Sequence, residues 1–413
     1  MEVKPGYKQT KVGVIPEDWK VSTLGAMAQT SSGTTPARAL QDRYYRNGTI
    51  AWVKTLDLNN SDLVATSERV TELALKETCL RVYPVGTVLV AMYGGFQQIG
   101  RTGLLRLPAA VNQAITAIQP KGDTLISEYL LGTLNYRVGY WRGVASSSRK
   151  DPNISSQDIR NFPIAYTSTT EQRAIAGALS DVDALLGALD QFIAKKRDLK
   201  QAAMQQLLTG QTRLPGFHGK WAVKRLGDVA QIISGGTPKT AESSYWNGGI
   251  KWCTPTDITG CASKYLVQTE RTISQHGLSN SGAQLLPAGA LLLCSRATIG
   301  EIRIAGCEVC TNQGFKSLVC QPGVSNEYLY YKLLTMKQQM VERAFGSTFL
   351  EISKANVVAL ELSIPDYLEQ TAIAEVLSDM DAELAALEQR RDKTRALKQG
   401  MMQELLTGRT RLV

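Results

Sequence analysis

The chain has 413 residues, of which 43% are hydrophobic and 20% are charged, so it is long enough for two folded domains. It contains no apolar run near the roughly 18–20 residues of a membrane helix, and residues 1–6 lack the apolar core of a secretory signal. We therefore expect a cytoplasmic protein with no membrane partner. The net charge of +9 favours a polyanionic binding partner.

Residues 1–18 are predicted to form an N-terminal linker segment. The stretch 10–16 precedes Trp19 and is similar to the stretch 212–217, which precedes Trp221. The second of these stretches directly follows a long helical pattern. We therefore expect the N-terminal segment to lie beside the C-terminal residues 411–413 and to complete a second linker of the same kind.

Residues 19–165 are predicted to form a first α/β domain with a small, irregular sheet. The apolar run 86–92 follows a Pro-x-Gly turn, which is typical of a strand. A helix is predicted from Ser127 to Trp141, because Leu130, Leu134 and Val138 recur at helical spacing between them.

Residues 166–214 are predicted to form a central helical region without internal proline, which ends near Gly210. About 40 helical residues would span about 60 Å. Apolar residues recur at alternating steps of four and three, the spacing of a coiled-coil seam. These predicted packing residues are Ile175, Leu179, Val182, Leu186, Leu189 and Ile193.

The second half of the chain repeats the first, with a second α/β domain at 215–363 and a C-terminal helical region at 364–413. Residues 32–36 return at 234–238, and more than half of the positions of 171–184 are identical in 369–382. The second seam comprises Ile373, Leu377, Met380, Leu384 and Leu387, and the pattern resumes at Leu397 and Leu405.

The two copies agree at the helices and diverge inside the domains. We therefore predict an α+β fold with two α/β domains in a pseudo-two-fold tandem repeat, separated by two long helices that form an antiparallel coiled coil. The alternative is two ordinary core helices, each of which packs on its own domain. A duplicated sequence that diverged without selection would also leave a repeat. Its divergence would be uniform, however, and would not leave the helical segments so much more similar than the domains.

The loops after the predicted strands differ most between the copies and carry side chains suited to DNA. Glutamine pairs with adenine, arginine with guanine, and threonine methyl groups contact thymine, while basic and hydroxyl residues grip phosphates. The candidate DNA-contacting residues are Tyr93, Gln97, Gln98, Arg101, Arg149, Lys150, Lys251, Arg296, Thr298, Ser347, Thr348 and Lys354. The alternative is that such Gly-rich polar loops are simple turns.

Some polar and aromatic residues recur in both domains, which indicates a shared structural role instead of base discrimination. They are Asn112-Gln113 with Asn312-Gln313, and Trp52 with Trp252. We expect both tryptophans to be core residues.

Along essentially its whole length, the chain resembles the specificity subunits of type I restriction-modification systems. The residues that carry the resemblance are 234–238, 245–252 with Asp257, the Glu-Gln-x-x-Ile-Ala-x-x-Leu-Ser-Asp-x-Asp blocks at 171 and 369, and the Leu-Leu-Thr-Gly-x-Thr-Arg-Leu endings. Residues 44–50 of the first copy match more loosely, with two extra residues.

The resemblance implies two target-recognition domains, each of which reads one half of a bipartite double-stranded DNA target. It also implies that the helical regions dock two adenine methyltransferase subunits and that a motor–nuclease subunit joins for cleavage. S-adenosylmethionine and ATP with Mg²⁺ are expected on those partners, and no cofactor is expected on this chain.

The sequence offers little support for catalysis on this chain. Asp151-Pro-Asn-Ile154 lacks the second proline and the aromatic residue of a methylation motif, and a phosphate-binding Gly-x-x-x-x-Gly-Lys motif is absent. Glu351 and Lys354 would be half of a nuclease motif without an acidic partner. We therefore expect no enzyme. The alternatives are a DNA-modifying enzyme with an unrecognised site and a coiled-coil adaptor whose heads bind protein.

The seven cysteines suit reduced thiols better than a disulfide framework, because their number is odd and six lie in the second half. Cys307 and Cys310 form a C-x-x-C pair near Cys320, whereas His218 and His276 lie far away in sequence. Since a structural zinc needs four ligands, we expect buried thiols and no metal site.

Overall fold

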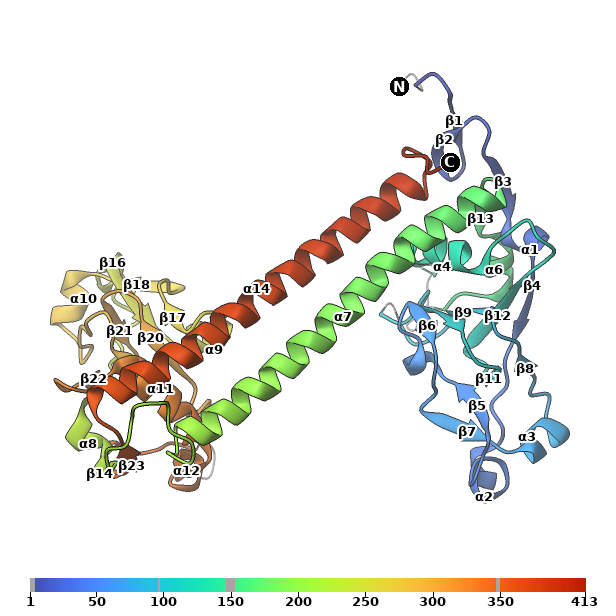
Figure 1. Ribbon diagram of the computed structural model, residues 1–413. Coiled ribbons are helices and arrows are strands. Elements are labelled where there is room, and N and C mark those ends of the chain that lie inside the picture. Colours follow the sequence, from blue (N-terminus) through green and yellow to red (C-terminus); the bar gives the residue numbers. More distant parts are fainter. Residues whose placement is uncertain (1–3, 96, 146–152, 347–349) are drawn as a thin grey trace. The chain divides into compact units, whose positions relative to one another are not determined.

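The computed structural model describes residues 4–95, 97–145, 153–346 and 350–413 (Figure 1). The chain divides into two compact units, Met1–Asp190 with Gln389–Val413, and Gln191–Glu388. We call residues 20–166 of the first unit the first head and residues 222–364 of the second unit the second head. In the described part of the chain, every helix is too short or too polar to cross a membrane.

In its described residues, the first unit contains four sheets and eight short helices. In sheet order, the strands are β1 (Tyr7–Thr10) and β2 (Gly13–Pro16); β4 (Ala28–Ser32), β12 (Ile115–Pro120), β9 (Val88–Ala91), β10 (Thr102–Leu105) and β6 (Ser61–Leu63); β7 (Glu68–Val70), β5 (Ile50–Val53), β11 (Ala109–Val111) and β8 (Val82–Tyr83); and β13 (Pro163–Tyr166) with β3 (Lys20–Thr23). The described short helices are α1 (Leu24–Met27), η1 (Arg38–Leu40), α2 (Gln41–Tyr44), η2 (Thr55–Asp57), α3 (Glu72–Glu77), α4 (Ser127–Tyr136), α5 (Gly139–Ala145) and α6 (Ser156–Asn161).

The second head repeats this order of sheets. Its strands are β15 (Ala230–Ser234), β22 (Lys316–Cys320), β19 (Leu291–Leu293), β20 (Ile302–Ala305) and β17 (Tyr265–Leu266); β18 (Arg271–Ile273), β16 (Trp246–Cys253) and β21 (Val309–Thr311); and β14 (Ala222–Arg225) with β23 (Glu361–Ile364). The described short helices are α8 (Leu226–Val229), η3 (Ser243–Tyr245), α9 (Pro255–Gly260), α10 (Gln275–Ser279), α11 (Asn326–Thr335), α12 (Lys337–Glu342) and α13 (Lys354–Val358). The two long helices are α7 (Thr169–Leu207) and α14 (Tyr367–Leu405).

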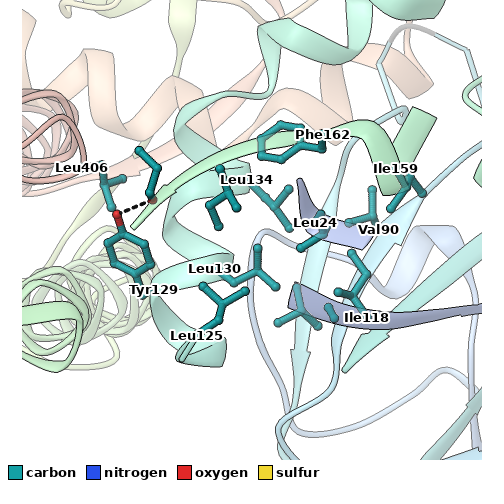
Figure 2. Close-up of a cluster of buried hydrophobic side chains, with 14 of the residues drawn as sticks. Leu24, Val90, Ile118, Leu125, Tyr129, Leu130, Leu134, Ile159, Phe162 and Leu406 are labelled. Carbon is teal, nitrogen blue, oxygen red and sulfur yellow. Dashed lines mark hydrogen bonds between the residues drawn. The ribbon is translucent and has the colours of Figure 1, made fainter. Parts of the chain in front are cut away.

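Each head is closed by the pairing of its first and last strands, β3 with β13 and β14 with β23, both antiparallel. The strand predicted at 86–92 is confirmed as β9, its counterpart in the second head is β19, and every residue of both strands is buried. Figure 2 shows the core of the first head, in which Tyr129 donates a hydrogen bond to the Ala165 carbonyl oxygen at 3.0 Å. Met402 and Leu405 of α14, and Leu406 directly after it, belong to the same cluster of buried side chains. The C-terminal end of α14 therefore belongs to the core of the first unit.

The helix predicted from Ser127 to Trp141 is interrupted between α4 and α5. The indole ring of Trp141 stacks on Phe162 with centroids 5.0 Å apart and covers Gly100, where a Cβ atom would come within 2.2 Å of the ring. The break at residues 137–138 turns this side chain into the core. The second head has the same break, between α11 and α12.

Within each unit, α7 and α14 pack against each other in an antiparallel arrangement, as predicted. In each unit, ion pairs join residues that come later in α7 to residues that come earlier in α14, as expected for antiparallel helices. Among the ion pairs that join the two helices are Asp183–Lys398 and Asp190–Arg395 in the first unit, and Arg197–Glu388 and Lys200–Asp381 in the second. These four contacts are two pairs of equivalent repeat positions.

The predicted seam residues are buried or half-buried, except at one later position where the pattern resumes. The buried members are Ile175, Leu179, Leu189, Ile193, Ile373 and Leu377, while Val182, Leu186, Met380, Leu384 and Leu387 are half-buried. Leu397, however, is 60% exposed, so its placement in the seam was wrong. The steps of four and three beyond Leu387 lead to Arg391, Thr394 and Lys398, and Thr394 is only 9% exposed. The seam therefore continues along the same face of α14, but its residues there are polar instead of apolar.

In each unit, the segment that follows one long helix contacts the first turn of the other long helix. Arg411 binds the buried Glu171 carboxylate in the first unit, and Arg213 binds the buried Glu369 carboxylate in the second. Arg411 also binds Asp18 at 2.9 Å, and the Tyr7 hydroxyl donates to the Gly408 carbonyl oxygen at 3.2 Å. The predicted position of the N-terminal segment beside the C-terminal residues is confirmed.

Candidate nucleic-acid interface

In the first head, three segments that are far apart in sequence meet after β9. The Met92 amide donates to the Ala114 carbonyl oxygen at 2.8 Å, and the Met92 carbonyl oxygen accepts from the Ile154 amide at 3.0 Å. The loop that follows β9 is closed by the bond from the Ala91 amide to the Arg101 carbonyl oxygen at 2.8 Å. The candidate residues Tyr93, Gln97 and Gln98 lie in this first reading loop, residues 92–101.

The second head joins its three equivalent segments by equivalent bonds. The Ser295 amide donates to the Gly314 carbonyl oxygen at 2.8 Å, and the Ile352 amide donates to the Ser295 carbonyl oxygen at 3.0 Å. The Cys294 amide closes the second reading loop, residues 295–301, by donating to the Glu301 carbonyl oxygen at 2.8 Å. The heads therefore share a backbone arrangement and differ in the length and side chains of the loop that it holds.

In the first reading loop, Tyr93 is 42% exposed and Gln97 is exposed. Gln98 folds back over the loop, since a Cβ atom on Gly94 would lie 2.4 Å from the Gln98 Oε1 atom. Arg101 is half-buried. The other candidates of this head, Arg149 and Lys150, lie outside the described residues.

In the second reading loop, Arg296 is exposed and pairs with Glu351, with the Arg296 Nε atom 3.0 Å from a carboxylate oxygen. This pairing holds the pKa of Glu351 below its usual value, and Lys316 adds to the effect. Ala297 has a φ of 61°, a left-handed conformation that costs a non-glycine residue on the order of 1 kcal/mol. Such local strain clusters at functional loops.

The remaining candidates of the second head are placed differently. The hydroxyl oxygen of Thr298 is buried, so it does not face solvent. Lys354 is exposed at the start of α13, close in sequence to Ile352 and therefore to the second reading loop. Lys251 lies on β16 in the other sheet, with its Nζ atom 3.1 Å from the Cys307 sulfur, and is not brought into this group. Ser347 and Thr348 lie outside the described residues.

The recurring polar residues have the shared structural role that the sequence indicated. The Thr35 hydroxyl donates to the Gln113 Oε1 atom, and the Thr237 hydroxyl donates to the Gln313 Oε1 atom. Trp52 and Trp252 are 1% and 4% exposed, which confirms them as core residues.

Two arginines near these tryptophans were missed by the sequence analysis. The Arg38 guanidinium lies 5.1 Å from the Trp52 ring centroid, and the Arg271 guanidinium lies 5.3 Å from that of Trp252. Arg271 could have been found from strand pairing, because it is the direct partner of Trp252 on the neighbouring strand. Arg38 gave no such signal, since it follows the Thr-Pro segment in a different part of the chain.

The cysteines lie mostly in or near the second head. Cys253, Cys294 and Cys310 are buried, and burial raises the pKa of the Cys310 thiol to about 11. Among the described residues, no group of three or more His, Cys, Asp or Glu side chains is arranged to hold a metal ion.

This chain is similar to type I restriction-modification specificity subunits in sequence, and to solved structures from such systems in fold. The MjaIX type I restriction enzyme specificity subunit of Methanocaldococcus jannaschii is 37% identical over 163 residues, which cover 39% of this chain and 38% of that relative. The putative MjaX specificity subunit of the same organism is 21% identical over 98% of this chain and 97% of that relative.

Two solved structures share the fold over nearly the full chain. The type I restriction-modification S subunit from M. genitalium has a TM-score of 0.60 at 15% identity and covers 98% of both chains. A chain from a structure concerned with the assembly and conformational transition of a type I R-M system also has a TM-score of 0.60, at 17% identity, and covers 95% of this chain and 99% of that one.

The family model described as the type I restriction modification DNA specificity domain matches residues 16–196 and again residues 218–395. Each match contains one head and one predicted seam. The chain therefore belongs to the type I restriction-modification DNA specificity family and carries the family's domain twice.

Proposed function

We propose that this chain directs a type I restriction-modification complex to a bipartite DNA target, with each head reading one half. The observation that carries this proposal is the contrast inside each head. The same three segments are joined by equivalent backbone bonds, yet the loop between them spans residues 92–101 in one head and 295–301 in the other, with different side chains. A common scaffold with different loops suits two readers of different sequences.

We further propose that α7 and α14 set the spacing between the half-sites. Each helix has 39 residues and runs without interruption from one unit to the other. Their pairing is specified by ion pairs at equivalent positions of the two units, which oppose a shift in register. A helix pair with a single register is a suitable spacer between two readers.

The same helices would dock two methyltransferase subunits. In the first unit, a groove beside α4 is lined by Ser180, Asp183, Lys398 and Met402 among other residues. The corresponding groove of the second unit is lined by Ser378, Asp381, Lys200 and Met204. The four residue types are the same, and a surface that occurs twice suits the same partner bound twice. S-adenosylmethionine would then lie on the methyltransferase subunits, and ATP with Mg²⁺ on a motor–nuclease subunit.

Methylation mapping tests this function directly. The chain would be expressed with its neighbouring methyltransferase in a host without adenine methylation, and the modified genome sequenced. We expect a two-part motif with an unspecified gap, methylated on both strands, which disappears when this chain is omitted. A stable complex that produces no motif would contradict sequence reading and favour an adaptor, and modification by the purified chain alone would favour an enzyme.

A head exchange tests the assignment of each half. Replacing residues 19–165 by the corresponding region of a relative should change one half of the motif and leave the other half unchanged. The reciprocal exchange of residues 215–363 is the matched control. If either exchange changed both halves, the modular assignment would be wrong.

A further inference from the structure

A polar contact recurs on the surface of both heads. We call it the Thr–Gln latch: Thr35 with Gln113 in the first head, and Thr237 with Gln313 in the second. The backbone approaches closely beside it, because a Cβ atom on Gly33 would lie 2.1 Å from the Val111 carbonyl oxygen. The latch thus fastens the Gly-x-Thr-Pro segment onto the Asn-Gln turn.

The latch leaves hydrogen-bond donors unused at equivalent places. Both glutamine side chains are exposed, and in each the amide oxygen accepts from the threonine hydroxyl. Within the described parts of the chain, neither glutamine Nε2 group has a hydrogen-bond partner. Fastening the segment requires only the amide oxygen, so the recurring N–H groups are available to a ligand.

The latch lies directly beside the reading loops. The residue after Gln113 is Ala114, whose carbonyl oxygen accepts from the Met92 amide at the start of the first reading loop. In the second head, Gly314 follows Gln313 and accepts from the Ser295 amide. A duplex in contact with a reading loop would therefore lie close to the latch of the same head.

Each latch also has an arginine nearby, and the two arginines come from non-equivalent positions. The Trp52 indole N–H donates to the Thr34 carbonyl oxygen at 3.3 Å, and the Trp252 indole N–H donates to Gly236 at 2.9 Å, so each tryptophan holds the backbone of the Gly-x-Thr-Pro segment. Arg38 lies over Trp52, and Arg271 lies over Trp252.

The strand register shows that these arginines are not equivalent in the repeat. Arg271 is the strand partner of Trp252, whereas the strand partner of Trp52 is Glu68. Glu68 pairs with Arg38 at 2.8 Å and also with Lys54 at 2.5 Å, so this group of three keeps a positive charge. Two non-equivalent sequence positions have thus placed a guanidinium group on equivalent tryptophans of the two heads.

We propose that Gln113 with Arg38, and Gln313 with Arg271, form a base-independent phosphate-binding site in each head. This inference rests on the proposed reading of different half-sites. An element that is the same in both heads cannot discriminate between different bases, but the sugar–phosphate backbone is the same at both half-sites. Amide N–H groups and guanidinium groups are ordinary donors to phosphate oxygens.

The test measures binding of the full-length chain to a fluorescent 40-base-pair duplex of mixed sequence over a series of salt concentrations. Gln113→Glu and Gln313→Glu keep an oxygen that accepts from the threonine hydroxyl, but they remove the donor and add a negative charge. We expect binding to weaken roughly tenfold or more for each substitution, without a change in melting temperature. For Arg38→Gln and Arg271→Gln, the slope of log affinity against log salt should become shallower by about one for each arginine.

Gln29→Glu and Gln231→Glu form the matched control. These glutamines are also exposed and also recur, but Gln29 lies at the opposite end of β4, facing Gln119, whereas Ser32 near the latch faces Thr116. The control should bind like the parent chain. The proposal is overturned if the latch variants bind like the parent or like the control, or if they weaken binding only in step with a lower melting temperature. If the latch variants bind DNA like the parent chain while the methylation motif is present, only this proposal is wrong. If the parent chain itself binds no duplex, both this proposal and the proposed function are wrong.

Discussion

Arg411 binds Glu171 although 240 positions separate them in the sequence. The Arg411 Nη2 group donates to the Glu171 Oε2 atom at 2.8 Å, and the Glu171 side chain is 0% exposed. Bonds to Glu171 and Asp18 raise the pKa of Arg411 above its usual value. Because Arg213 binds Glu369 in the same way, the segment that follows each long helix binds the first turn of the other long helix. The recurring Glu-Gln and Thr-Arg-Leu stretches thus bind each other, in one equivalent contact in each unit.

Arg411→Ala should destabilise the first unit by about 3–5 kcal/mol, because it leaves the buried Glu171 carboxylate without its cation. Arg213→Ala should destabilise the second unit, because it removes the cation that binds the buried Glu369 carboxylate. Urea unfolding combined with limited proteolysis would report which unit opens. Arg409→Ala is the control, since Arg409 is 55% exposed in its pair with Glu404 and should matter by less than about 0.5 kcal/mol. Equal losses for Arg409→Ala and Arg411→Ala would refute the role of the buried pair.

The corrected seam predicts opposite outcomes for two leucines of α14. Leu377→Ala should cost about 2–5 kcal/mol, because Leu377 is 0% exposed and its removal leaves a cavity. Leu397→Ala should change stability by less than about 0.5 kcal/mol, because most of that side chain already faces solvent. Denaturant unfolding of both variants checks the phase of the helix. A large loss from Leu397→Ala would restore the position that the sequence pattern suggested.

Two glycines should respond to alanine in opposite directions. Gly33→Ala would place a Cβ atom against the Val111 carbonyl oxygen, so we expect a loss of about 1–3 kcal/mol. Gly177 is an exposed residue of α7 with open space around its Cα atom, and Gly177→Ala should stabilise by about 0.5–1 kcal/mol through helix propensity. Thermal unfolding distinguishes the two. A neutral Gly33→Ala would show that the segment can move away from the Asn-Gln turn at little cost.

Lys332 predicts a pH dependence in the second unit. It is 8% exposed, its Nζ group donates to the Leu208 carbonyl oxygen at 2.7 Å, and burial lowers its pKa in the folded protein. The unfolded chain therefore holds this proton to higher pH than the folded chain does. Between the two pKa values, the stability of the parent chain rises with pH.

A comparison with Lys332→Met isolates this effect, because the other titrating groups are common to both proteins. From pH 7 to pH 10, the parent chain should gain stability relative to the variant, as measured by urea unfolding at each pH. Parallel curves, or a relative loss of stability in the parent chain, would mean that burial does not depress the pKa of Lys332.

The repeat, the two long helices and the spacing of the apolar residues along them can be read from the amino-acid sequence. These features depend on local periodicity and on identity between copies, both of which can be read along the chain. The recurrence of Asn112-Gln113 and Trp52 in the second copy likewise identified structural residues before their partners were known. The boundaries of the five predicted segments and the candidate base contacts stay predictions, and four of those candidates, Arg149, Lys150, Ser347 and Thr348, lie outside the described residues.

Which side chains are in contact depends on the tertiary structure. In the sequence, Leu397 looks like the next apolar residue of the seam. In the helix, however, Leu397 faces solvent, and Thr394 occupies the buried position instead. The break before α5 exists because Trp141 packs on Phe162 and Gly100, which are distant in sequence. Arg38 reaches Trp52 from a loop, while Glu68 takes the place that Arg271 has in the second head. Such contacts follow from the paths of separate segments in space, and no spacing within one segment encodes them.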